Sequence, residues 1–158
     1  MRLYAISDLH TDQPQNRGWV EALPLHTYTR DALLVAGDVH HNLEQLGKTL
    51  SLLCEHFAQV FFVPGNHDVW IRPGENLNSL TKFEATLKIC DTLGVQTGPG
   101  RVGLPGDPRP VWIVPLFSWY HEEGPDSLHA PKVNEVPHAT PLMWADTYLV
   151  PQLSKVVG

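Results

Sequence analysis

Cysteine is scarce in this sequence, since the 158-residue chain contains only Cys54 and Cys90. The two form no C-x-x-C motif, and so few thiols cannot build a disulfide framework. We expect each to be a small buried hydrophobic side chain in a reducing compartment, with a disulfide as the less favoured alternative.

Long apolar runs are also missing. No stretch approaches the roughly 18 consecutive apolar residues that a helix needs to span a bilayer. The N-terminus enters a strand-like segment directly, without the charged lead and apolar centre of a signal peptide. The sequence therefore predicts a soluble, cytoplasmic protein with no membrane partner.

Positive charge is in deficit, because 11 Lys and Arg residues face 17 Asp and Glu residues, which gives a formal net charge of −6. Proteins that bind the phosphate backbone usually have a basic surface, so nucleic acid is an unfavoured partner and a nuclease an unfavoured function. Bound metal ions could reverse the charge locally. A small phosphorylated substrate therefore remains compatible with this composition.

Strand-like apolar runs alternate with helical patterns as far as residue 119, which favours βαβ units and an α/β fold. A run covered on both faces, such as residues 32–36, is continuously apolar. Residues 98–110, rich in Gly and Pro, predict a loop. The expected strands are 2–7, 32–36, 60–63, 95–97 (short) and 111–119, and the expected helical segments are 16–23 (helical or irregular), 43–57 and 79–93.

Two of these helices carry an apolar stripe and a terminal signal. Asn42 is a plausible N-cap of the first, and Gly94 is a stop for the second. Leucines and aromatics recur at steps of three and four residues, which predicts one buried face on each helix. The predicted faces are Leu43, Leu46, Leu50, Leu53 and Phe57 on the first, and Leu80, Phe83, Leu87, Cys90 and Leu93 on the second.

The length suits one domain. Residues 1–120 form its predicted core. Beyond Tyr120 five prolines interrupt the sequence and no strong period remains. Residues 121–158 are therefore expected to be a Pro-rich, irregular or divergent continuation of the same domain.

Polar motifs follow three of the predicted strands: Asp8-Leu9-His10, Gly37-Asp38 and Gly65-Asn66-His67-Asp68. In an open α/β sheet the ends of parallel strands meet at one crevice, where such folds bind ligands. Oxygen and imidazole ligands that meet there suit a divalent metal centre. The first two motifs alone are common in turns, whereas the third is more specific, and their order and placement after strands argue for a shared site.

The residue types suggest particular roles. Asp8 and His10 are two apart, so in an extended segment they point to the same side and can reach one metal. Asp38 follows a glycine that permits a sharp turn, and one carboxylate can bridge two cations.

The third motif adds a possible proton carrier. Asn66 offers a neutral carbonyl ligand, and His67 could donate a proton or a hydrogen bond to an anionic substrate. Asp68 could orient that imidazole or stabilise its cationic form.

Together these motifs resemble the first three motifs of the calcineurin-like metallophosphoesterases. The resemblance covers about residues 1–120 and implies a layered α/β/β/α sandwich, of which this chain would hold the N-terminal portion. It implies two divalent ions of the Mn, Fe or Zn type and hydrolysis of a phosphate mono- or diester by metal-activated water. Asp8 and His10 would bind the first ion, Asp38 would bridge both, Asn66 would bind the second, and His67 would assist catalysis.

Members of that family also carry two later histidine motifs, which this sequence lacks. His121, at the end of a predicted strand, is the most plausible spare ligand. His40 and His41 could reach the site, although exposure on a loop is the favoured interpretation. Because of the missing motifs, the alternative function is a catalytically incomplete remnant that acts as a binding or regulatory module.

Overall fold

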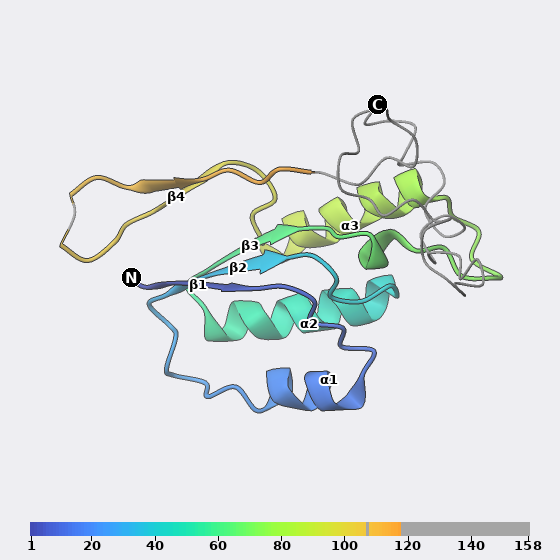
Figure 1. Cartoon of the computed structure of the whole chain (residues 1–158), viewed down its shortest axis with the longest axis horizontal. Helices are drawn as coiled ribbons and strands as arrows, with labels where there is room; N and C mark the ends of the chain where they lie inside the picture. The colour runs from blue at the N-terminus through green and yellow to red at the C-terminus, as the bar shows by residue number, and fades with distance from the viewer. Residues whose placement is uncertain (107, 118–158) are drawn as a thin grey trace, which may run out of the picture.

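Three parallel strands form the central sheet of this protein, for which a computed structural model describes residues 1–106 and 108–117 (Figure 1). The strands are β1 (Leu3–Ile6), β2 (Ala32–Ala36) and β3 (Gln59–Val63), and they lie side by side in the order β1-β2-β3. This confirms the α/β class and the first three predicted strands, with shifts of one residue at some ends.

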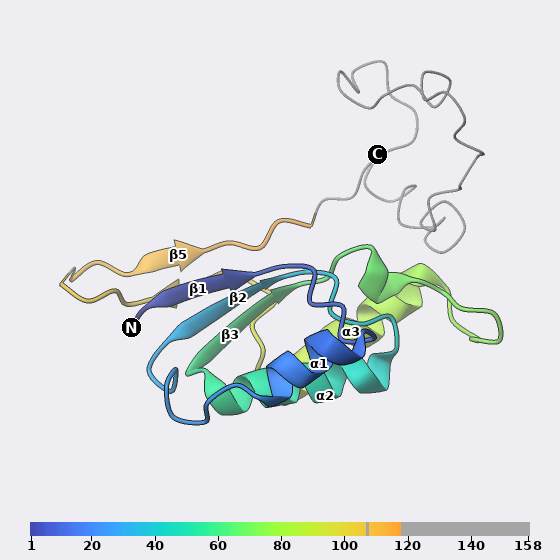
Figure 2. The same cartoon turned by 60° about the horizontal axis from the view of Figure 1, so that its bottom comes forward.

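Helices connect and follow these strands, and they lie on the same face of the sheet (Figure 2). They are α1 (Pro14–Glu21), α2 (Leu43–His56) and α3 (Ser79–Leu93), with a short 3₁₀ helix η1 (His67–Val69) before α3. Each crossover advances one strand in the same direction, and right-handed crossovers of this kind place their helices on one face. The opposite face is thereby left to other elements.

That opposite face is covered in part by a two-stranded antiparallel ribbon, β4 (Gly100–Val102) and β5 (Val111–Ile113) (Figure 2). Alternate side chains of the sheet divide the core accordingly. Leu33, Val60 and Phe62 pack with the helices, whereas Ala32 and Phe61 pack with Val102 of the ribbon. Strands β2 and β3 are therefore largely buried from both sides, whereas Leu3 and Ala5 of β1 are exposed.

The helix-terminal signals behave as the sequence predicts. The Asn42 side chain accepts a hydrogen bond from the N–H of Gln45 at the start of α2. Gly94 ends α3 with φ of 74°, a left-handed conformation that glycine adopts at little cost. These contacts fix where α2 and α3 begin and end relative to the strands.

The predicted face of α3 is wrong in part. Its most buried residues are Ser79, Lys82, Thr86 and Cys90, while Leu80 is 38% exposed. The helix is rotated so that the Lys82 ammonium donates to the Glu75 carboxylate at 2.8 Å and to the carbonyl of Trp70. A buried charge must be paired, and this pairing sets the helix phase in place of the leucines.

Two predictions near the ribbon also need correction. The predicted loop 98–110 contains β4, and the predicted strand 111–119 ends at Ile113, with Pro115 soon after. In the predicted strand 95–97, Gln96 alone forms a parallel bridge, to Phe61. Residues 118 and 119 of the longer prediction lie outside the described part of the chain.

Both cysteines are free thiols, and Cys90 is fully buried. Within the ranges that the structure describes, no helix has the length and apolar character to cross a membrane. Residues 121–158 fall outside these ranges, so the division of the domain near residue 120 stays a prediction.

Candidate metal centre

The loops that leave β1 and β2 run side by side and are joined by backbone hydrogen bonds. The N–H of His10 donates to the carbonyl of Asp38 at 2.8 Å, and the N–H of Thr11 donates to Val39 at 2.9 Å. The N–H of Asp8 reaches the carbonyl of Gly37 at 3.3 Å. The first two predicted motifs are therefore fixed against each other by the backbone.

Two glycines bring the third motif equally close to the second. A Cβ atom on Gly37 would lie 2.8 Å from the backbone of Gly65, and Gly37 has φ of +78°. A Cβ on Gly65 would lie 2.2 Å from Oδ1 of Asp38 and 2.8 Å from its backbone nitrogen. Only glycine permits this approach, so both glycines are part of the site architecture.

Asp68 joins the same two loops from beneath and is completely buried. Its Oδ2 accepts from the N–H groups of Asp38 and Gly65, both at 2.8 Å. Its Oδ1 accepts from Val39 at 2.7 Å and His40 at 2.9 Å. Burial raises the pKa of this carboxyl to about 6, while the backbone N–H groups act in the opposite direction.

The predicted role of Asp68 as the partner of the His67 imidazole is therefore wrong. The Asp68 carboxylate is occupied by four backbone donors. The His67 ring instead faces His41 and Asp12. Asp68 therefore has a structural role: it holds the loops of the site together and takes no direct part in its chemistry.

Three of the predicted metal ligands have strained backbones. Asp8, His10 and Asp38 have φ of 54°, 41° and 56°, and they are the non-glycine residues with positive φ in the described part of the chain. This region is sparsely populated by residues with a Cβ and is costly. Strain that coincides with these three side chains indicates that function, rather than folding, selects them.

The same three side chains meet. One ligand atom from each of Asp8, His10 and Asp38 lies within 4.8 Å of the others. Nε2 of His10 lies 3.8 Å from Oδ1 of Asp8, and Oδ1 of Asp38 accepts from the N–H of His67 at 2.9 Å. The structure thus brings together the residues predicted at the ends of β1 and β2.

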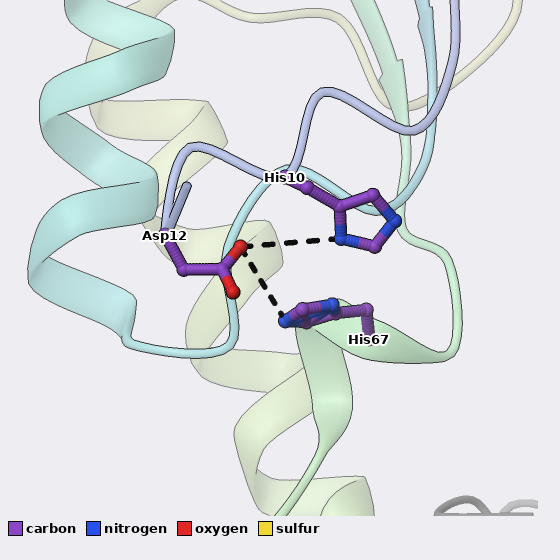
Figure 3. A group of neighbouring side chains, drawn as sticks. All are labelled: His10, Asp12 and His67. Carbon is purple, nitrogen blue, oxygen red and sulfur yellow. Dashed lines mark ion pairs between the residues drawn. The ribbon is translucent and has the colours of Figure 1, made fainter. Parts of the chain in front are cut away.

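A second group shares His10 and adds a residue that sequence reasoning missed (Figure 3). Oδ1 of Asp12 lies 4.0 Å from Nδ1 of His10 and 4.0 Å from Nε2 of His67. The signal was present as the two-residue spacing Asp8-x-His10-x-Asp12. Such a spacing is a weak signal, because an acidic residue after a strand is also common in turns.

His67 lies in a pocket of rings. It is 4% exposed, its ring stacks on Trp70 with centroids 4.2 Å apart, and its Nε2 lies 3.3 Å from Nδ1 of His41. Burial, with a smaller effect of His10, lowers the pKa of His67 to about 4. The metal-free ring is therefore neutral at pH 7.

The favoured interpretation of His40 and His41 as exposed loop residues is wrong. His40 is 8% exposed, and its Nδ1 accepts the N–H of Asn42. His41 contacts His67 directly. The turn after Asp38 folds both rings inward because Asp68 holds the backbone of that turn.

A comparison with protein-family models matches residues 1–151 to the calcineurin-like phosphoesterase model. The chain belongs to the calcineurin-like phosphoesterase family. This confirms the family that the resemblance predicts.

Two comparisons with individual members of the family point to the same kind of protein, from Mycobacterium tuberculosis. The chain is 36% identical over 128 residues to the acyl-carrier-protein phosphodiesterase PptH, an alignment that covers 75% of this chain and 37% of the relative. It also resembles the crystal structure of the phosphopantetheinyl hydrolase PptH, with a TM-score of 0.63 and 33% identity over 73% of this chain and 42% of that one. The chain thus spans well under half the length of these phosphoesterases.

The side chains present fit the divalent ions that the phosphoesterase family implies. The two groups supply carboxylate oxygens and imidazole nitrogens, which suit ions of the Mn, Fe or Zn type. Oδ1 of Asp12 and Nδ1 of His67 are also buried without a hydrogen-bond partner among the described residues. Unmet polar atoms beside converging ligands are expected where an ion completes a site.

All the predicted ligand roles stay predictions, and Asn66 and His121 are not members of the two groups. Asn66 directly precedes η1 and lies next to His67, and its backbone carbonyl accepts the N–H of Val69 at 3.2 Å. Its place beside the group suits a second ion, as predicted for it. His121 lies outside the described residues.

Proposed function

We propose that this chain hydrolyses phosphate esters with the aid of divalent cations held at the ends of β1, β2 and β3. The observation that carries the proposal is the convergence of Asp8, His10 and Asp38 on backbones that are strained at all three positions. Strain at converging ligands marks a site built for chemistry. Membership of the phosphoesterase family supplies the reaction class.

Each side chain has a part in this proposal. Asp8, His10 and Asp38 hold a first cation, and Asp38 with Asn66 hold a second. Such ions supply an activated water nucleophile at neutral pH and offset charge on the phosphoryl oxygens. The fixed loops of the site keep these ligands in register without further rearrangement, which favours catalysis.

His67 acts as the proton carrier. Its ring is neutral at pH 7 in the metal-free protein because burial lowers its pKa. A neutral imidazole has one donor and one acceptor nitrogen, so its N–H can donate a hydrogen bond to a phosphoryl oxygen. Its free nitrogen can accept the proton that the water nucleophile releases, and the ring then passes a proton to the leaving-group oxygen. Stacking on Trp70 restricts the ring to one plane.

A phosphodiester is the substrate class to test first. The similar protein from M. tuberculosis is named as a phosphodiesterase of acyl-carrier protein. Membership of the phosphoesterase family alone is also compatible with a phosphate monoester as the substrate. We therefore propose a small phosphodiester, such as a phosphopantetheine-type ester, before a monoester.

The direct test is metal-dependent turnover. We expect purified, chelator-treated protein to hydrolyse bis(p-nitrophenyl) phosphate only after Mn²⁺ or Zn²⁺ is restored, and p-nitrophenyl phosphate more slowly. Release of p-nitrophenol against time measures both. Lack of turnover with every added ion, in folded protein, would contradict the proposal.

A pair of variants separates the two roles in the site. We expect Asp38→Asn to weaken binding of both ions, because a neutral amide replaces the bridging carboxylate. His67→Gln should leave ion binding near wild type but slow turnover by roughly 10² to 10⁴, the usual contribution of a general acid or base. Titration calorimetry with Mn²⁺ and steady-state kinetics measure the two effects.

The reverse pattern would contradict the assigned roles: His67→Gln losing an ion, or Asp38→Asn keeping two. Asp91→Asn, which makes the same chemical change at an exposed position on α3, is the matched control and should behave as wild type.

A binding module is the second candidate function, and it is motivated by the two later histidine motifs of the family, which this sequence does not contain. Residues 1–120 would then form a phosphoesterase-like core that lacks later ligands. Tight binding of a single Mn²⁺ without turnover would support this candidate over the enzyme.

A further inference from the structure

We propose that Asp12 is a positioning residue that holds the imidazoles of His10 and His67 in the orientation the metal centre requires. This inference rests on the proposed function, since it concerns the same site. Asp12 is not among the residues that the strand-end motifs supply.

The two ring nitrogens of His10 lie near different carboxylates. Nε2 of His10 lies 3.8 Å from Oδ1 of Asp8, and Nδ1 lies 4.0 Å from Oδ1 of Asp12. The two candidate metal groups therefore use opposite nitrogens of one ring. A histidine bound to ions through both nitrogens would have to lose both of its ring protons, so one side must hold a hydrogen instead.

The Asp8 side is the better side for an ion. It offers the carboxylates of Asp8 and Asp38 around a single ring nitrogen. The Asp12 side offers one carboxylate between the rings of His10 and His67 (Figure 3). With Nε2 of His10 facing the ion, its Nδ1 carries the hydrogen and faces Asp12, which is the usual arrangement behind a metal-bound histidine.

The same carboxylate oxygen faces His67. Oδ1 of Asp12 is 4.0 Å from Nε2 of that ring and has no hydrogen-bond partner among the described residues. One acceptor oxygen thus lies between a predicted ion ligand and the predicted proton carrier. Both distances exceed a hydrogen bond by about 1 Å, so the proposal requires the side chains to move closer when an ion binds.

The backbone around Asp12 is already fixed. The hydroxyl of Thr11 donates to the carbonyl of Val39 at 3.1 Å and lies 3.0 Å from the hydroxyl of Thr49 on α2. The N–H of Gln13 closes a turn on the carbonyl of His10 at 2.8 Å. The residues on either side of Asp12 are therefore attached to the loop after β2, to α2 and to His10.

The test compares Asp12→Ala, which removes the acceptor, with Asp12→Asn, which keeps a neutral acceptor oxygen. We expect Asp12→Ala to bind Mn²⁺ 10- to 100-fold more weakly by calorimetry, the usual effect of losing such a partner, with an unchanged number of ions per chain. Asp12→Asn should lie between Asp12→Ala and wild type. Asp91→Ala, on the exposed side of α3, is the matched control and should bind as wild type does.

A second readout needs no metal. In ¹⁵N spectra of the metal-free protein, Asp12→Ala should raise the fraction of His10 that carries its hydrogen on Nε2, because Asp8 still faces that nitrogen while no carboxylate then faces Nδ1. Thermal melting of each variant establishes that the fold is kept. A merely structural Asp12 would change the melting point and leave the tautomers as they are.

Three results would overturn the inference: unchanged Mn²⁺ affinity in Asp12→Ala, loss of a whole ion per chain, which would make Asp12 a direct ligand, or unchanged tautomers. Failure of the proposed function looks different, because wild-type protein would then bind no ion or hydrolyse no ester. The tautomer measurement still decides the role of Asp12 in that case.

Discussion

Gly65→Ala is expected to remove ion binding and to reduce hydrolysis by at least about 100-fold, the loss that follows misplacement of reacting groups by roughly 1 Å. The new Cβ would lie 2.2 Å from Oδ1 of Asp38 and 2.8 Å from its backbone nitrogen. Backbone cannot move aside as a flexible side chain can, so the loops after β2 and β3 must separate. Calorimetry with Mn²⁺ and turnover of the diester measure the two losses.

Gly103→Ala is the matched control, because a Cβ there meets nothing within 4 Å. It should retain wild-type binding and turnover. If Gly65→Ala bound Mn²⁺ as tightly as this control, the close packing of the two loops would not be what places Asp38.

Asp68→Asn is expected to lower the free energy of unfolding by about 2 to 6 kcal/mol, since each of two buried donors left unpaired costs about 1 to 3 kcal/mol. The amide nitrogen would point at two backbone N–H groups that the carboxylate now accepts. Those donors would be left buried and unpaired. Urea or guanidinium unfolding, followed by circular dichroism, measures the change in midpoint.

Asp91→Asn, the same chemical change on an exposed surface of α3, should leave the unfolding midpoint where it is. A wild-type midpoint for Asp68→Asn would show that the two loops are held by other contacts. The proposed attachment of the second motif to the third would then fail.

Local signals explain what the sequence predicts well. Some features depend only on residues that are close together in the sequence. They are the apolar runs that form β2 and β3 and the N-cap at Asn42. The convergence of Asp8, His10 and Asp38 agrees with the rule that parallel strands end at one crevice. The extended backbone predicted for Asp8 and His10 is wrong, because both are left-handed. Strand-end placement was therefore enough to find one side of the site.

The errors concern contacts between residues far apart in the chain. Asp68 binds backbone groups about 30 residues away, and the ring of His41 reaches His67 across two loops. No periodicity encodes such pairings. Asp12 was missed for the same reason. Its carboxylate joins the site only because the fold places His67, which is far away in the sequence, beside it.

Helix α3 shows how a single charge can override a pattern. Its leucines and Phe83 predict an apolar inner face, yet Lys82 is 1% exposed and pairs with Glu75. The ion pair ties the segment after η1 to the helix. Residue spacing cannot reveal a partner that lies in a loop.

The left-handed backbones at Asp8, His10 and Asp38 have a consequence for evolution and for engineering. Glycine would relieve the backbone strain at each of these positions. Random mutation with selection for thermal resistance alone would therefore favour substitutions that remove the ligands. A stabilised descendant of this protein should be screened for ion uptake before its melting temperature is taken as an improvement.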